Sequence, residues 1–190
     1  MEIGVQKWFS KLERSWKRLC EDYARGEFCP ISENDIVCYL YYSLIAHEKI
    51  AKNYIHTNYP VKIEGMQVDI FLGKNLPRRE IKSKPLLVEI KFRKRRLDYY
   101  LDHYRFKPTE RVFFGDDVEK LIKLRSAGSG VAAVFFQKLP PSSSCREKCD
   151  NVTLQQWVEL ESLMKELEDK LKNEQIRLLY GPRLAREHDI

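Results

Sequence analysis

The chain alternates between segments whose apolar residues recur every three or four positions and short segments that are apolar throughout. The first kind predicts amphipathic helices, and the second predicts buried strands. Helical spacing begins near the amino terminus and ends before Gly26, a residue that favours the end of a helix. The apolar members of this first helix are Val5, Trp8, Phe9, Leu12, Trp16, Leu19 and Tyr23.

A second helix is predicted to begin after Ser32. Ser32 is a favourable N-cap, and Asp35 three residues later gives a capping-box pattern. Glu33 stands one turn before the apolar stripe and therefore on its buried side, whereas Asp35 is turned away from it. Glu33 has two interpretations: a first-turn acid favoured by the helix dipole, or a member of a site at the end of a sheet. The stripe comprises Ile36, Val37, Leu40 and Leu44.

Short apolar runs predict the strands of a sheet. The polar, turn-rich segment 73–84 separates two of these runs and predicts an antiparallel hairpin. A helix predicted over 116–124 then separates two further runs, which indicates a crossover between parallel strands. The predicted class is α/β, with a single mixed β-sheet flanked by helices on both sides. The runs are 54–59 and 61–63, broken at Pro60, followed by 68–72, 84–92, 131–136 and 176–180.

Charged residues interrupt the two runs of the predicted hairpin. Glu89 and Lys91 share one face of the later strand, because side chains alternate along a strand. A hairpin centred near Arg79 places Asp69 opposite Glu89. Buried charges are costly unless they are paired or hold a metal, and neighbouring carboxylates repel unless a cation lies between them. The pattern therefore predicts a charged site on one face of the hairpin.

These residues also carry a family resemblance. Asp69, followed by Glu89-Ile90-Lys91, resembles the core motif of the PD-(D/E)XK nucleases, the restriction-endonuclease-like superfamily that includes Holliday junction resolvases. The resemblance covers about residues 31–137, and Gln67-Val68 stands where the family has a proline. It implies a restriction-endonuclease-like fold and a metal-dependent nuclease, most simply a DNA endonuclease.

The resemblance also implies roles for individual residues. Asp69, Glu89 and the carbonyl of Ile90 would hold Mg²⁺ or Mn²⁺. Lys91 would orient or activate the attacking water and stabilise developing charge. Glu33 matches the acidic residue that the family carries at the start of its first core helix, and it would complete the metal shell directly or through water.

A cationic segment follows the later strand of the hairpin at once. Cations neutralise phosphates, and aromatic rings downstream can stack on unpaired bases, so we expect this segment to bind nucleic acid. A helix whose aromatic residues pack on the sheet is compatible with the same pattern. The cations are Arg93, Lys94, Arg95 and Arg96, and the aromatic residues are Tyr99, Tyr100, Tyr104 and Phe106.

Composition narrows the class of protein only slightly. Lys and Arg number 34 against 28 Asp and Glu, and the net charge of +6 mildly favours polyanionic partners. No apolar run approaches the ~20 residues of a membrane span, and no signal peptide is recognisable, so we expect a cytoplasmic protein without a membrane partner. Five irregularly spaced cysteines, among them Cys145 and Cys149, fit neither a disulfide framework nor a zinc site.

A last helix is predicted after a capping box at Thr153 and Gln156. Its apolar stripe can dock on the sheet or form a dimer interface, and we expect a homodimer because two active sites related by a twofold axis cut both strands of a duplex most simply. The stripe is Trp157, Leu160, Met164, Leu167 and Leu171. We interpret 1–190 as one domain, made of an amino-terminal helix in 1–28, a nuclease-like core in 31–137 and a terminal helix and strand in 152–182.

Three alternatives to a DNA nuclease remain open. One is a non-catalytic nucleic-acid-binding module on a nuclease-like fold, which metal dependence would distinguish from the enzyme. Another is a structural or interaction protein that assembles through the 153–173 helix, in which Asp69 or Glu89 pairs with Lys91 to stabilise the fold. Absence of nucleic-acid binding at low salt would indicate it. The third is an RNA nuclease.

Overall fold

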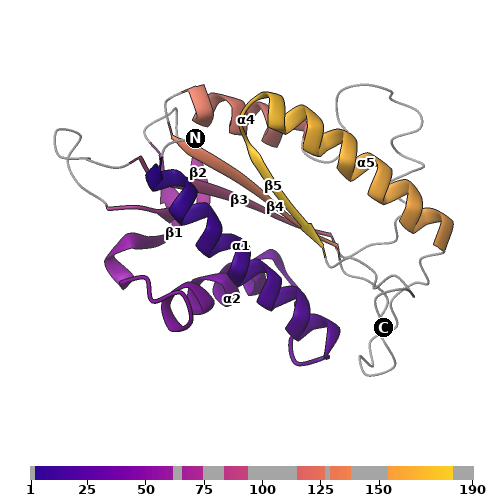
Figure 1. The fold of residues 1–190 in the computed structure, drawn as a ribbon, viewed down its shortest axis with the longest axis horizontal. Coiled ribbons are helices and arrows are strands. Elements are labelled where there is room, and N and C mark those ends of the chain that lie inside the picture. The colour runs from indigo at the N-terminus through magenta and orange to yellow at the C-terminus, as the bar shows by residue number, and fades with distance from the viewer. Residues whose placement is uncertain are drawn as a thin grey trace.

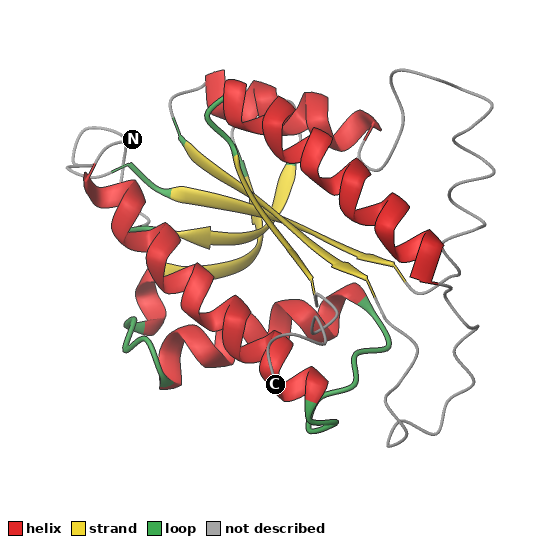
Figure 2. Cartoon of the chain, turned by 45° about the vertical axis from the view of Figure 1, so that its right-hand side comes forward, coloured by secondary structure: helices red, strands yellow, loops and turns green. Residues whose placement is uncertain are grey.

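The computed structural model describes residues 3–61, 66–74, 84–93, 115–126, 129–137 and 154–181. Within these ranges the chain forms one mixed five-stranded sheet with helices on both faces (Figure 1, Figure 2). The predicted α/β class with a single mixed sheet is confirmed. The strands lie in sequence order as β1 (Ile55–Pro60), β2 (Gln67–Leu72), β3 (Leu86–Arg93), β4 (Gly130–Gln137) and β5 (Arg177–Gly181).

The sheet is antiparallel on one side of β3 and parallel on the other. β1, β2 and β3 pair antiparallel, whereas β3, β4 and β5 pair parallel. Parallel neighbours need crossover connections, and α4 (Gly115–Ser126) and α5 (Leu154–Asn173) lie in the two crossovers. In the hairpin, Ile70 pairs with Val88 and Leu72 with Leu86, which is the predicted register, but the pairing ends there and does not extend to the predicted pair of Asp69 and Glu89.

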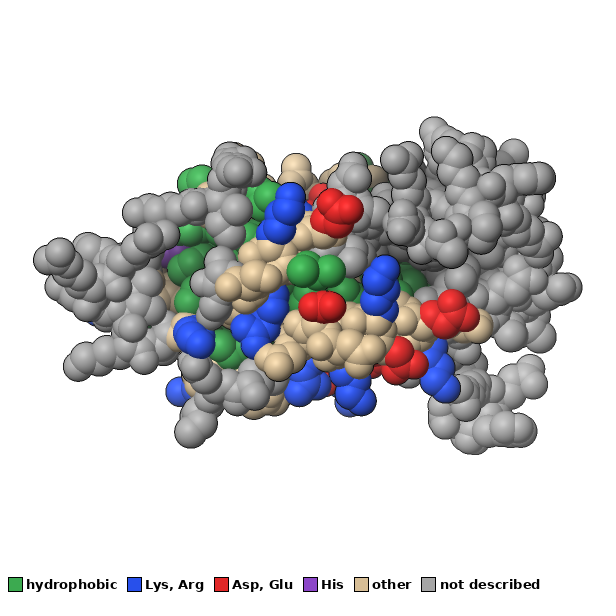
Figure 3. Space-filling view, turned by 90° about the horizontal axis from the view of Figure 1, so that it is seen from above, with side chains coloured by type: hydrophobic (Ala, Val, Ile, Leu, Met, Phe, Trp, Pro, Cys, Tyr) green, Lys and Arg blue, Asp and Glu red, His purple; other side chains and the backbone are tan. Residues whose placement is uncertain are grey.

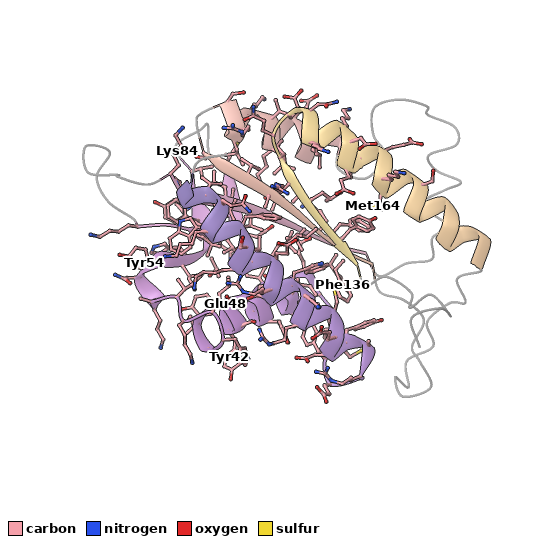
Figure 4. All side chains as sticks on the ribbon, viewed as in Figure 1. Tyr42, Glu48, Tyr54, Lys84, Phe136 and Met164 are labelled. Atoms are coloured by element: carbon pink, nitrogen blue, oxygen red, sulfur yellow. The ribbon has the colours of Figure 1, made fainter. Side chains whose placement is uncertain are left out.

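Two helices cover the first face of the sheet. α1 (Ile3–Ala24) ends before Gly26, whose φ of 75° is the left-handed conformation expected at a helix end. α2 (Glu33–Ala46) follows the predicted cap, and a short 3₁₀ helix (Lys52–Tyr54) leads into β1. Phe136 on β4 packs edge-on against Tyr23 of α1, with ring centroids 5.1 Å apart (Figure 4). The apolar stripes of α1 and α2 thus bury this face.

α4 and α5 cover the opposite face. Leu121 and Leu124 of α4 and Met164 and Leu171 of α5 are buried in one cluster with the sheet, and Leu167 packs against it (Figure 4). Of the two roles predicted for the α5 stripe, docking on its own sheet is observed at these positions, and Met164 and Leu171 are therefore not available as an exposed dimer interface. The side chains of the other two stripe residues, Trp157 and Leu160, lie outside the described part of the chain.

The described surface on the α4 and α5 side is mixed in charge. Seen from above, Lys and Arg side chains stand beside Asp and Glu side chains and do not form a patch of one sign (Figure 3). None of the helices in the described ranges is long and apolar enough to cross a membrane.

Candidate active site

β2 and β3 separate beside the acidic residues that the sequence singles out. Their pairing ends at Ile70 and Val88, whereas β3 continues to Arg93 along β4. On the far side of β2, the register places Asn58 opposite Asp69, and Asn58 has a left-handed φ of 49°. Asn tolerates this conformation better than most residues. Because the pairing with β2 ends at Val88, the end of β3 has β4 as its one strand partner in the described part of the chain.

Two carboxylates take the place of the missing strand partner. The Ile90 N–H donates to Asp69 Oδ2 at 2.6 Å, and the Phe92 N–H donates to Glu33 Oε2 at 3.3 Å. Both amides point away from β4, and the N–H and C=O of a strand residue point to the same neighbour. The Ile90 carbonyl consequently faces the same space. We call this place the β2–β3 fork.

Glu89 lies beside the fork and is only 3% exposed. The Lys91 ammonium lies 3.3 Å from Glu89 Oε1. The Lys120 ammonium of α4 donates to Glu89 Oε2 at 2.6 Å. Two charge-assisted contacts therefore compensate one buried carboxylate. We include Lys120 with Glu33, Asp69, Glu89 and Lys91 in the fork from here on.

Sequence reasoning missed Lys120. It precedes Leu121 directly and Leu124 by four residues, and both leucines are buried against the sheet. Residues four apart share a face of a helix, so Lys120 lies at the border of the buried stripe of α4. A lysine at the edge of an apolar stripe, on a helix that follows the charged strand, was the only signal available in the sequence.

The carboxyl of Asp69 has a perturbed acidity. Burial raises its pKa first, and the negative charges of Glu89 and Glu33 raise it further, to about 6. The Ile90 amide and the Lys91 ammonium act in the opposite direction. Three carboxylates therefore interact electrostatically in the fork. Such perturbed groups are enriched at functional sites.

The structure brings together four of the predicted site residues from distant parts of the chain: Glu33, Asp69, Glu89 and Lys91. Asp35 instead caps its helix, as expected, because its Oδ2 accepts the Ile31 and Ser32 amides, each at 2.8 Å. The predicted phosphate-binding residues cannot be placed in the same way. Arg93 is the last residue of β3, but its side chain is not among the described ones. Lys94, Arg95 and Arg96 lie wholly outside the described residues.

The donor chemistry of the fork fits a hard divalent cation. Carboxylate and carbonyl oxygens suit Mg²⁺ and Mn²⁺. The described residues hold no group of three or more acidic, His or Cys side chains already arranged around one point. Asp69 and Glu33 accept from different amides, which lie two residues apart on β3. Glu33 would therefore join the ion most simply through water.

Comparison with known proteins adds little to this geometry. No family model matches the chain, and no curated protein matches it. The solved structure of Pyrococcus furiosus SfsA in complex with Ca²⁺ is similar over 77% of this chain, with 12% identity and a TM-score of 0.35. The chain spans 56% of the length of that protein. A likeness of this extent carries no weight for the chemistry of the fork.

Proposed function

We propose that this chain is a divalent-cation-dependent nuclease that hydrolyses phosphodiester bonds in DNA at the β2–β3 fork. The observation that carries the proposal is the meeting of Asp69, Glu89 and Lys91 with Glu33 at the end of β3, where β4 is the one strand partner among the described residues. The order of a hairpin followed by a parallel crossover, with the acids and the lysine on the hairpin, supports a restriction-endonuclease-like version of the α/β fold.

The charge balance of the fork supports the same function. Glu33, Asp69 and Glu89 carry three negative charges when ionised, and Lys91 and Lys120 carry two positive charges, which leaves one negative charge in excess. A divalent cation changes this excess to one positive charge. A bound phosphodiester anion then neutralises it, so the fork suits the cation and the substrate together better than either alone.

Each residue of the fork has a separate role in the proposed reaction. Mg²⁺ or Mn²⁺, when bound, would supply a water of lowered pKa and stabilise charge on the phosphate. Asp69, Glu89 and the Ile90 carbonyl would hold the cation, and Glu33 would do so through water. Lys91 is fixed on the strand next to Glu89, where its ammonium can orient the attacking water and donate to oxygens that gain charge.

The cationic segment 93–96, which begins at the last residue of β3, supports a nucleic-acid substrate, and the resemblance of the motif to the PD-(D/E)XK nucleases supports DNA. The proposal includes a homodimer, since two active sites would serve the two strands of a duplex. The docking of α5 on its own sheet leaves the interface to surfaces other than Met164 and Leu171.

One observation favours a second candidate function. Both oxygens of Glu89 already contact an ammonium group, from Lys91 and Lys120. A charged network satisfied in this way also suits a non-catalytic nucleic-acid-binding module, in which the ion pairs hold β3 and α4 together. The two functions differ in their need for a divalent cation.

A substrate panel tests the proposal. The purified chain is incubated with Mg²⁺ or Mn²⁺ and plasmid, linear duplex, single-stranded and four-way-junction DNA, with single-stranded RNA alongside. We expect cation-dependent cleavage of at least one DNA, abolished in Asp69→Asn and retained in Glu48→Gln, a matched change at a buried acid far from the fork. Binding without cleavage under all conditions would contradict the proposal and support the binding module.

A further inference from the structure

We propose that the Lys120 ammonium contacts the Glu89 carboxylate only until a divalent cation binds to that carboxylate. The released Lys120 ammonium then binds a non-bridging oxygen of the phosphodiester. This inference rests on the proposed function of the same fork. It adds to the site a residue from α4, which lies outside the motif on the hairpin.

The contacts of Glu89 require such an exchange. Lys120 Nζ lies 2.6 Å from Oε2, and Lys91 Nζ lies 3.3 Å from Oε1. A divalent cation that ligates this carboxylate would lie close to at least one of the two ammonium groups. Two cations at that separation repel strongly in a site with little water. One lysine must therefore move away when the ion binds.

The attachment points of the two lysines decide which one moves. Lys91 lies two residues from Glu89 on the same strand and on the same face, so its attachment point stays beside the carboxylate whatever the ion does. Lys120 reaches Glu89 from a different element, and although the two lysines are similarly exposed, at 21% and 18%, only Lys120 can leave the carboxylate without leaving its own strand neighbour. Its helix is anchored by the buried Leu121 and Leu124, so the side chain can swing while the backbone of α4 stays in place.

The released side chain would have a ligand close by. A lysine ammonium is a compact, strongly hydrated charge on a flexible stem, and it binds phosphate as a point charge. Swinging away from Glu89 leaves Lys120 at the rim of the fork, where a phosphodiester bound to the cation must enter. The exchange thus couples cation binding to the creation of a positive contact for the substrate.

The first test uses the wild-type chain. Lysine acetylation is mapped by mass spectrometry with and without Mn²⁺, while calorimetry reports Mn²⁺ binding in the same buffer. We expect the acetylation rate of Lys120 to rise several-fold with Mn²⁺, and that of Lys123, an exposed lysine on the same helix, to stay constant. Mn²⁺ binding with no change at Lys120 would overturn the inference alone. Absence of Mn²⁺ binding would overturn the proposed function as well.

The second test uses matched variants. Lys120→Met should bind Mn²⁺ about tenfold more tightly than wild type, because the competing charge-assisted contact is gone. Lys123→Met should leave the affinity unchanged, and Lys120→Arg, which keeps the charge, should change it by less than about twofold. Tighter binding in Lys91→Met but not in Lys120→Met would overturn the inference.

The substrate contact has its own readout. In a Lys91→Ala background, which prevents turnover, DNA affinity is measured in Mn²⁺ over a series of salt concentrations. Adding Lys120→Met should reduce the log–log salt slope by about 0.9, the value for one phosphate contact, and adding Lys123→Met should not. Equal slopes with and without Lys120 would overturn the assignment of the released ammonium to phosphate.

Discussion

Glu48 and Asp69 are two acids withdrawn from solvent in one small protein, and their surroundings are opposite. Glu48 follows α2 and accepts Arg14 Nε at 3.0 Å and Arg14 Nη2 at 2.5 Å (Figure 4). The Arg14 guanidinium holds the pKa of Glu48 below its usual value. Asp69 accepts a backbone amide, and burial together with the charges of Glu89 and Glu33 raises its pKa to about 6.

The fold supplies Glu48 with a cationic partner, whereas the surroundings of Asp69 disfavour its negative charge. Arg14 compensates the charge of Glu48, so this contact between α1 and the end of α2 needs nothing further. The fork gathers more negative charge than its lysines compensate, which costs stability at neutral pH. Costs of this kind are typical of sites at which a ligand completes the charge balance.

The largest expected effect is on cleavage. Glu89→Gln and Lys91→Ala should each lower the rate of DNA cleavage at least about a hundredfold, because each removes a charge that acts on the reacting phosphate or its cation. Glu48→Gln should cleave at the wild-type rate. Initial rates on the best substrate of the panel, measured on folded variants, give the comparison. Equal rates in Glu89→Gln and Glu48→Gln would remove the distinction between the two regions.

The next effect is a gain of stability. Asp69→Asn should raise the free energy of unfolding at pH 7.5, without added metal, by roughly 1 to 3 kcal/mol. The folded state raises the pKa of Asp69 from 3.8 to about 6, so it binds the proton more tightly than the unfolded chain does. The wild type therefore loses stability as pH rises from about 4 to about 6.

Urea unfolding at pH 4 and pH 7.5 measures this gain. The advantage of Asp69→Asn should appear at pH 7.5 and shrink toward pH 4. An asparagine variant that is less stable than the wild type at pH 7.5 would show that the fork is electrostatically satisfied, as the ion-pair alternative requires.

Glu33 and Asp35 lie two residues apart on α2, and we expect opposite effects of their substitution on metal affinity and on stability. Glu33→Gln should weaken Mn²⁺ affinity about tenfold, the lower end for residues that support a metal site from outside the direct ligands. It should leave stability nearly unchanged. Asp35→Asn should cost about 1 kcal/mol of stability, because its carboxylate caps α2, and should preserve Mn²⁺ affinity. Calorimetry measures the Mn²⁺ affinity of both variants, and urea unfolding measures their stability. Weaker Mn²⁺ binding in Asp35→Asn, with lost stability in Glu33→Gln, would contradict the assignment.

The smallest effect concerns Glu48 itself. Glu48→Gln should cost about 1 kcal/mol of stability at pH 7.5, a modest value because the Arg14 partner is largely exposed. Its pKa is lowered in the folded state, so the contribution is present above pH 4.5 and is lost as pH falls. The pH dependence should therefore run opposite to that of Asp69→Asn. The difference in unfolding free energy between variant and wild type should change with pH in opposite directions for Glu48→Gln and Asp69→Asn. A change in the same direction for both variants would contradict the comparison.

Much of the fold follows from local patterns in the sequence. The alternation along 68–72 and 84–92 and the connecting segment determined the hairpin register, and this register is observed. The cap at Ser32 set the start of α2 and turned Asp35 away from Glu33. These features depend on neighbouring residues, for which one sequence suffices.

Contacts between distant elements were harder to foresee. Lys120 meets Glu89 only because the crossover lays α4 over β3 and β4, and no local pattern fixes that docking. The α5 stripe at Met164 and Leu171 fitted either a sheet or a partner chain, since both bury the same apolar side chains. The separation of β2 from β3 beside Asp69 likewise results from the path of whole strands.

The claim on which the others depend is that Asp69 and Glu89 hold one divalent cation. Anomalous scattering from a crystal grown with Mn²⁺ tests it directly. The account predicts one peak within about 2.5 Å of a carboxylate oxygen of each residue, with Lys120 withdrawn from Glu89. A fork without a peak, in which Lys91 and Lys120 both remain on Glu89 at saturating Mn²⁺, would contradict it.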